Sequence, residues 1–233
     1  MIKSRKPQDQ ISNHLSQRRQ ILNKNTDFTI QEAYKQLRTN IRFCIRDQKC
    51  KKFCITSGQA SEGKSITTLN LAISIAQTGK KVLLIDADLR RPAVARLLVE
   101  KASPGLTEVL SGDATVQEAV HTEVYSNLDI LFSGEIPPNP SELLSSEELA
   151  ALIETNTEKY DYILVDTPPV NIVTDACVIA NLLDGVLLLV REGRASKEDV
   201  RQAINNLQLT GANILGYILN GAESNSSKYY GVY

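Results

Sequence analysis

The sequence predicts an α/β fold, a doubly wound and mainly parallel sheet that is flanked by helices. Two observations carry this prediction. Short apolar runs alternate along the chain with segments of helical spacing, which is the pattern of strands connected by helices. Many of these runs are apolar at nearly every position, as parallel strands buried on both faces are. The 233 residues also suffice to bury a substantial core.

The individual elements follow from the same pattern. The predicted strands span residues 52–56, 81–85, 128–132, 162–165, 185–190 and 214–219. The predicted helices span residues 29–46, 65–78, 93–99, 146–159, 173–183 and 197–209. Thr29 with Glu32 is a candidate cap for the first helix, and Ser196 with Asp199 for the last. Residues 133–147 are predicted to be a crossover loop, because its prolines prevent a helix over most of its length.

A phosphate-binding motif lies between the first strand and the helix that follows it. It reads G-x-x-x-x-G-K-S, with Gly58, Gly63, Lys64 and Ser65 at the defining positions. The glycines let backbone N–H groups face the phosphates, the lysine neutralises them, and the serine hydroxyl is a Mg²⁺ ligand. We therefore predict a fold of the P-loop NTPase type rather than a glycine turn before a surface helix. The predicted nucleotide-binding residues are Gly58, Gln59, Ala60, Ser61, Glu62, Gly63, Lys64, Ser65 and Ile66.

Two acidic motifs follow predicted strands. Asp86 and Asp88 come directly after the second strand, and Asp166 comes directly after the fourth. Ligands of open α/β sheets bind beyond the carboxyl ends of the strands, where the P-loop also lies. An aspartate that ends an apolar strand is the Walker B pattern, which holds Mg²⁺. We expect Ser65, Asp86 and Asp166 to hold this ion, with three carboxylates converging on one metal–phosphate site.

These acidic residues leave alternatives open. Each strand-ending aspartate could instead cap the helix that follows it. Asp88 is a candidate catalytic base, although it could pair with Arg90 or Arg91. The two arginines are either solvated or turned towards the phosphates. Asp175 has either a helix-terminal role or a contact with the γ-phosphate, and Asn220 is a candidate for hydrogen bonding to the nucleotide base.

Composition and charge exclude other classes of function. The formal net charge is −1 and tryptophan is absent, so no nucleic-acid partner is expected. No apolar run approaches the roughly 18 residues of a membrane span, and the basic N-terminus lacks the apolar region of a signal peptide. Both observations predict a cytoplasmic chain. The four cysteines have no metal-ligand spacing and are expected to be reduced and mostly buried.

Three regions are predicted. Residues 1–28 form a flexible basic arm, residues 29–221 form the P-loop domain, and residues 222–233 form a mobile polar tail. Within residues 1–25, six Lys or Arg side chains stand against one acidic side chain. The arm is either a simple leader or a segment that touches an anionic membrane surface or an acidic patch on a partner.

Taken together, the three motifs resemble those of the bacterial tyrosine kinase (BY-kinase) family of capsular and exopolysaccharide assembly, in particular its cytoplasmic Gram-positive type. The resemblance extends from about residue 31 to the C-terminus, with Ala60 where many members have proline. It implies an ATP-dependent protein-tyrosine kinase with ATP and Mg²⁺ as cofactors. It also implies catalytic roles for Lys64, Asp86, Asp88 and Asp166.

The C-terminus strengthens this resemblance. Tyr229, Tyr230 and Tyr233 place three of the eight tyrosines in the last five residues. In the family such a cluster is autophosphorylated between subunits, whereas the alternative is a chance cluster at a disordered end. Other protein-tyrosine substrates are expected as well.

Partners are also implied by the resemblance. Glu32, Lys35 and Arg38 resemble the family's E-x-x-R-x-x-R helix, which builds a homo-oligomeric ring; lysine in place of the first arginine keeps the charge but loses the bidentate fork. In Gram-positive relatives the kinase is activated by the cytoplasmic end of a membrane-spanning polysaccharide co-polymerase adaptor. Recruitment to the inner face of the cell membrane is therefore expected.

Two other functions remain as alternatives. A positioning ATPase of the partition and septum-placement type carries a second lysine early in the P-loop, where this chain has Gln59, and it has no use for a tyrosine tail. A scaffold that binds nucleotide only to assemble does not need the full set of Lys64, Asp86, Asp88 and Asp166. The sequence therefore favours the kinase.

Overall fold

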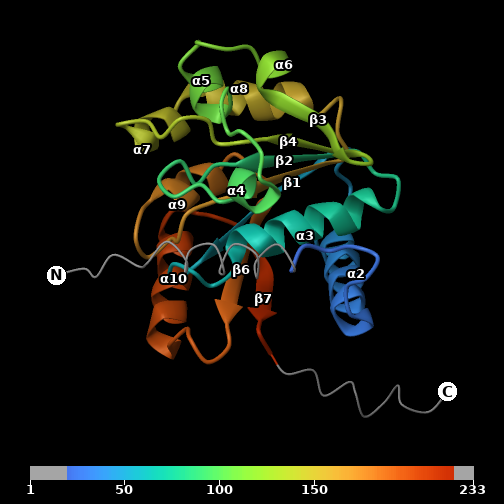
Figure 1. The fold of residues 1–233 in the computed structure, drawn as a ribbon. Coiled ribbons are helices and arrows are strands. Elements are labelled where there is room, and N and C mark those ends of the chain that lie inside the picture. Colours follow the sequence, from blue (N-terminus) through green and yellow to red (C-terminus); the bar gives the residue numbers. More distant parts are fainter. Residues whose placement is uncertain (1–19, 223–233) are drawn as a thin grey trace, which may run out of the picture.

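The computed structural model describes residues 20–222 of the chain. Its strands form one sheet in the order β3-β4-β2-β5-β1-β6-β7 (Figure 1). The strands are β1 (Lys51–Ser57), β2 (Val82–Asp86), β3 (Val120–Tyr125), β4 (Leu128–Leu131), β5 (Tyr162–Asp166), β6 (Gly185–Arg191) and β7 (Ile214–Asn220). Neighbouring strands are parallel, except that β3 is antiparallel to β4. The predicted mainly parallel sheet is confirmed, and β1 lies inside it between β5 and β6.

Helices cover both faces of the sheet. They are α2 (Phe28–Cys44), α3 (Lys64–Ala76), α4 (Val94–Leu98), α5 (Leu106–Leu110), α6 (Val116–Ala119), α7 (Pro140–Leu144), α8 (Glu147–Asn156), α9 (Asp175–Ala180) and α10 (Lys197–Leu209). Phe53 and Ile55 of β1 pack in a core with residues of α2, α3 and α4, whereas Cys54 packs in a second core with residues of α8, α9 and α10. Burial on both faces explains the continuous apolar runs of the sequence. Figure 1 shows α3 lying along the sheet with α2 beside it.

Some elements differ from the prediction. The edge strand β3 was not predicted, and neither were the short helices α5, α6 and α7. Helix α7 begins at Pro140 inside the predicted crossover loop, where proline is tolerated because the first helical N–H needs no partner. The cap of α2 is Asp27, whose carboxylate accepts a hydrogen bond from Thr29 N at 2.8 Å. The predicted Thr29 cap is therefore wrong, whereas the predicted Ser196 cap of α10 is confirmed.

The end of the predicted flexible arm packs against the domain. Ile21 and Leu22 are buried in the same core as α3. Asn70 of α3 accepts a hydrogen bond from Leu22 N at 2.8 Å and donates one to Gln20 O at 2.8 Å. Two apolar side chains and a satisfied backbone hold this segment, so residues 20–27 belong with the domain rather than with a free arm. Residues 1–19 and 223–233, which include the predicted phosphorylation sites, lie outside the described residues.

Two smaller predictions can be compared with the structure. All four cysteines are free thiols, and Cys50, Cys54 and Cys177 are buried while Cys44 is exposed. Among residues 20–222, no helix is both long and apolar enough to cross a membrane.

Candidate active site

The P-loop connects β1 to α3 at the carboxyl edge of the sheet. Gly63 is the N-cap of α3 and contributes no side-chain hydrogen bond to the first turn. The first N–H groups of a helix have no intrahelical partner, and the helix dipole adds partial positive charge there. The start of this 13-residue helix therefore suits a phosphate group.

The shape of the loop requires glycine at position 63. Its φ is +101°, in the region that L-residues rarely adopt, and a Cβ there would collide with the side-chain amide of Asn220. That same amide donates a hydrogen bond to Glu62 O at 2.8 Å. The predicted nucleotide-binding residue Asn220 thus fastens the end of β7 to the P-loop backbone.

The first half of the loop is fastened to α10. Gln59 Nε2 donates to Asp199 Oδ1 at 2.7 Å, and Ser57 Oγ donates to Gln59 O at 2.7 Å. The other carboxylate oxygen of Asp199 accepts from the Ser196 hydroxyl at the start of α10. Hydrogen bonds from Ser196 and Gln59 lower the pKa of Asp199, so a negative charge is kept beside Gln59.

Charged side chains of the loop are nearly buried. Lys64 is 7% exposed and forms no ion pair with any residue of the described range. Glu62 is 1% exposed, and neither carboxylate oxygen has a hydrogen-bond partner among residues 20–222. Burial raises the pKa of Glu62, and the nearby charge of Lys64 opposes this shift. The ammonium group of Lys64 is thus available for an anion brought by a ligand.

Asp86 and Asp166 lie side by side at the ends of β2 and β5, where they are register partners. Both are fully buried. Asp86 Oδ2 accepts from Val94 N at 3.0 Å and Oδ1 from Asp88 N at 3.3 Å, so Asp86 also caps α4, as the alternative interpretation proposed. Burial and then the charge of Asp166 raise the pKa of Asp86 to about 8. Burial raises the pKa of Asp166 to about 6.

One oxygen of Asp166 is suited to a metal ion. Its Oδ1 accepts from Thr68 Oγ1 at 3.3 Å, whereas Oδ2 is buried without a partner in the described range. The Ser65 side chain lies close enough to the same carboxylate to lower its pKa. A hydroxyl beside an unsatisfied carboxylate oxygen fits the predicted Mg²⁺ ligands, because this ion takes hard oxygen donors and keeps several waters. Sequence reasoning missed Thr68, although a polar residue one turn after Lys64 in an apolar helix could have indicated it.

Three carboxylates do not converge on one metal. Among residues 20–222, no group of three His, Cys, Asp or Glu side chains is placed to hold an ion. Asp88 lies near the pair of Asp86 and Asp166, because its charge contributes to the raised pKa of both. Its side chain is 7% exposed, and Oδ1 accepts from Arg91 N at 3.0 Å. It pairs with neither arginine, because Arg90 is bound to Asp175 with Nε and Oδ2 2.8 Å apart. The fully buried Asp175 begins α9, which agrees with a helix-terminal role.

Comparison with known proteins identifies the family to which the chain belongs. A family model described as "AAA domain" matches residues 50–214. The tyrosine-protein kinase YwqD of Bacillus subtilis is 42% identical over 202 residues, which is 87% of this chain and 85% of that protein. The chain belongs to the bacterial tyrosine kinase family. Another bacterial tyrosine kinase, CpsD of Streptococcus agalactiae, is 37% identical over 200 residues, 85% of each protein.

Solved structures agree with this assignment. The chimerical protein CapA2B2 has a TM-score of 0.82 and 34% identity, covering 86% of this chain and 88% of that one. The septum site-determining protein MinD of Pyrococcus horikoshii, complexed with Mg-ADP, has a TM-score of 0.63 and 27% identity over 75% of this chain and 72% of that one. The bacterial tyrosine kinase therefore has the fold of a P-loop NTPase, and it is a protein-tyrosine kinase, as the sequence predicted.

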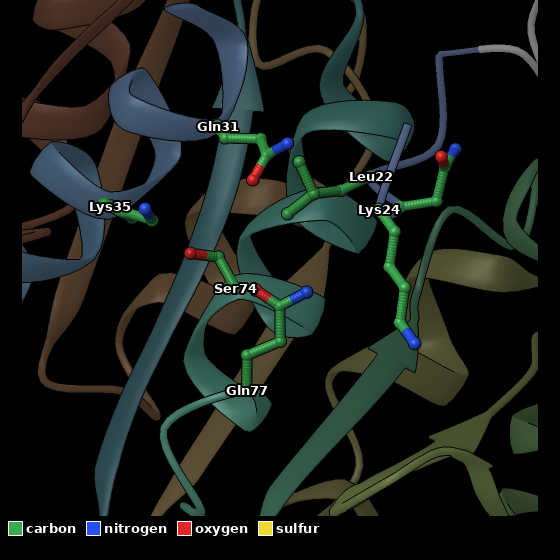
Figure 2. A pocket seen from close by; sticks show the side chains of 7 residues that line it. Leu22, Lys24, Gln31, Lys35, Ser74 and Gln77 are labelled. Atoms are coloured by element: carbon green, nitrogen blue, oxygen red, sulfur yellow. The ribbon is translucent and has the colours of Figure 1, made fainter. Parts of the chain in front are cut away.

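In this bacterial tyrosine kinase, the row of residues predicted to form a subunit interface, Glu32, Lys35 and Arg38 of α2, forms contacts within the chain. Lys35 Nζ and Glu32 Oε1 are 2.6 Å apart, and Arg38 Nη1 donates to Ser74 O of α3 at 2.7 Å. A pocket of about 110 Å³ lies beside Lys35, and no P-loop residue lines it. Figure 2 shows its lining side chains. Its lining residues are Leu22, Asn23, Lys24, Gln31, Lys35, Ser74 and Gln77. A role of the row between subunits remains a prediction.

Proposed function

We propose that this kinase transfers the γ-phosphoryl group of ATP to Tyr229, Tyr230 and Tyr233 of a neighbouring copy. The observation that supports this best is the position of Asp88. It lies two residues after Asp86, yet in the described range it is not engaged in an ion pair and keeps one carboxylate oxygen without a hydrogen bond. A carboxylate beyond the metal ligands can serve an acceptor hydroxyl.

The P-loop supplies the donor half of the reaction. Backbone N–H groups of the loop and of the start of α3 bind the phosphates, and Lys64 offsets their charge. Ser65 and Asp166 would hold Mg²⁺, with Asp86 beside them; when bound, this ion offsets the charge of the phosphates. The amide oxygen of Asn220 is left to face the base. The rate gain arises from positioning and charge stabilisation more than from covalent chemistry.

The acceptor half is formed by Asp88. Its unbonded oxygen accepts the proton of the tyrosine hydroxyl as the oxygen bonds to the γ-phosphorus. The bond between that phosphorus and the bridging oxygen of ADP breaks at the same time. Asp88 Oδ1 remains hydrogen-bonded to Arg91 N, which keeps the other oxygen directed at the acceptor.

The relatives suggest the setting of this reaction. We propose that phosphorylation regulates capsular or exopolysaccharide biosynthesis and that the kinase acts on other protein-tyrosine substrates as well. Its activator would be a membrane-spanning polysaccharide co-polymerase adaptor, which would recruit it to the cytoplasmic face of the membrane. The α2 row of Glu32, Lys35 and Arg38 would join copies into a ring once its contacts within the chain are exchanged.

The likeness to MinD favours a second candidate, a positioning ATPase in which water is the acceptor. Gln59 counts against it, because the second lysine of that class is absent here. An assay of phosphate release with water as the only acceptor distinguishes the two. Rapid release without phosphotyrosine would favour the ATPase.

The direct test is phosphotyrosine formation by the full chain in ATP and Mg²⁺, with and without a cytoplasmic adaptor fragment. Lys64→Met should abolish the signal, whereas Lys80→Met, a surface lysine paired with Asp161, should retain it. Phenylalanine at all three tail tyrosines should remove autophosphorylation and leave ATP binding intact. The absence of phosphotyrosine in the wild-type chain under both conditions would refute the proposal.

A further inference from the structure

One loop and the starts of two helices at the carboxyl edge of the sheet are fastened to one another by a partly buried cluster of Arg90, Ser141 and Asp175. We propose that this cluster is a clamp that positions Asp88 for phosphoryl transfer. In this role Arg90 and Asp175 are positioning residues that touch neither nucleotide nor acceptor. The inference rests on the proposed function, because it takes Asp88 as the group that meets the tyrosine hydroxyl.

The clamp is a closed set of hydrogen bonds. Arg90 Nε lies 2.8 Å from Asp175 Oδ2, and Arg90 Nη2 lies 3.2 Å from Asp175 Oδ1. Ser141 Oγ accepts from Arg90 Nη2 at 2.7 Å and donates to Asp175 Oδ1 at 2.9 Å. The Asp175 side chain is fully buried, and the Arg90 side chain is 36% exposed. Both carboxylate oxygens of Asp175 and the hydroxyl of Ser141 are therefore hydrogen-bonded within the cluster.

Each member comes from a different part of the chain. Arg90 lies in the loop between β2 and α4, Asp175 is the first residue of α9, and Ser141 is the second residue of α7. Figure 1 shows α7 and α9 at the same end of the sheet, and the two helices are in contact. The clamp therefore joins the loop that carries Asp88 to the segment that follows the Asp166 strand and to the proline-rich segment.

Asp86 accepts hydrogen bonds at both ends of the loop that carries Asp88, and Arg90 connects the middle of this loop to other segments. The carboxylate of Asp86 accepts from Asp88 N at 3.3 Å and from Val94 N at 3.0 Å. Between these points, Leu89 is buried in the core, and Arg90 is the residue whose side chain forms hydrogen bonds and an ion pair with other segments in the described structure. Because Arg90 is two residues from Asp88, a turn of the loop at Arg90 also changes the direction of the Asp88 carboxylate.

The chemistry of the pair suits orientation. An arginine fork on a carboxylate makes two parallel hydrogen bonds and so fixes a direction as well as a distance. Lysine keeps the charge but not the fork. An error of about 1 Å at a reacting group costs on the order of 10²-fold in rate. Loss of the fork should therefore be seen in the turnover step.

The alternative to this clamp is an arrangement in which Arg90 leaves Asp175 and binds a phosphate of the nucleotide. The two arrangements predict different kinetics. A phosphate ligand contributes to nucleotide affinity, whereas a positioning residue contributes to kcat. Measuring both constants on the same variants decides between them.

The experiment compares wild-type protein with Arg90→Lys, Asp175→Asn and Ser141→Ala. Arg201→Lys is the matched control, because Arg201 forms an exposed pair with Glu198 on α10. Rates are measured by phosphotyrosine formation on a peptide of residues 223–233, and affinity is measured by titration with a fluorescent, non-hydrolysable ATP analogue in Mg²⁺. Urea denaturation corrects every rate for the folded fraction.

We expect kcat to fall on the order of 10²-fold in Arg90→Lys and Asp175→Asn, with the nucleotide Kd within about twofold of wild type. Ser141→Ala should lose less, since the ion pair remains. The double variant of Arg90→Lys and Asp175→Asn should be no slower than the slower single variant, because both substitutions remove the same contact.

Different outcomes overturn different claims. A weaker nucleotide affinity with unchanged kcat would show that Arg90 is a phosphate ligand and would refute the clamp. Lower stability with both constants unchanged would reduce the cluster to a structural role and also refute it. A wild-type protein that is inactive both with and without the adaptor fragment would refute the proposed function and the role of Asp88 with it. An active wild type beside a fully active Arg90→Lys would refute the clamp alone.

Discussion

Replacing Asp166 by asparagine separates the cost of its buried charge from its use in the kinase. The side chain is fully buried, Oδ1 accepts from Thr68, and Oδ2 has no partner in the described range. Asparagine has nearly the same shape and keeps an oxygen for Thr68, but it carries no charge. The ligand-free variant should therefore gain stability relative to wild type as the pH rises.

The magnitude follows from the pKa. Burial raises the pKa of Asp166 from 3.8 to about 6, so the native state prefers the protonated acid. The stability that this group contributes in acid is lost as the pH rises from about 4 through 6. The shift corresponds to about 3 kcal/mol, most of it between pH 4 and pH 8. An amide N–H without an acceptor costs about 1–3 kcal/mol at every pH. It therefore shifts the difference in the free energy of unfolding between variant and wild type by a constant and does not change how that difference depends on pH.

The assay is urea denaturation of both proteins from pH 4 to pH 8 in EDTA, without nucleotide. The free energy of unfolding of the variant minus that of wild type should rise by about 2–3 kcal/mol across this range. Glu198→Gln, the same kind of change at an exposed carboxylate, is the control. A difference that does not depend on pH, or that falls as the pH rises, would refute the reasoning.

Three further predictions concern the loop, the helix behind it and the metal. Gly63→Ala should weaken the binding of fluorescent Mg·ATP at least about tenfold, because +101° is strained for alanine and its Cβ would meet Asn220; unchanged affinity would contradict this. Arg38→Ala should lower the free energy of unfolding by about 1 kcal/mol in urea titrations, because the Ser74 carbonyl in the last turn of α3 loses its donor, and an equally stable variant would disprove it. Removing Mg²⁺ with EDTA should abolish phosphotyrosine formation, and added Mg²⁺ should restore it; activity that persists in EDTA would exclude the metal role of Asp166.

The parts of the site that sequence reasoning could find are those with local signals. A glycine-rich loop between an apolar strand and a helix positions Lys64 and Ser65 without any knowledge of tertiary contacts. Asp86 and Asp166 follow apolar strands, and parallel strands end at one edge of the sheet. Their register as neighbours on β2 and β5 is the additional fact that the structure supplies.

Other features depend on contacts between distant residues. Arg90 and Asp175 are 85 positions apart, and nothing near either one in the sequence indicates its partner. Strand β3 is an edge strand that is half exposed and irregularly paired with β4, so it lacks the apolar run that marked the others. The α2 cap was misplaced because Thr29 and Asp27 both have side chains that can accept from a helical N–H.

The hydrogen bond between Gln59 and Asp199 bears on how related enzymes could be interconverted. A lysine introduced by Gln59→Lys would lie next to the carboxylate of Asp199, which already accepts a hydrogen bond from the side chain at position 59 although it lies 140 residues further along the chain. The new ammonium group would be drawn to Asp199 of its own chain. A single substitution at position 59 would therefore not free a second P-loop lysine for the nucleotide, and a design towards a partition-type ATPase would have to remove the acid on α10 as well.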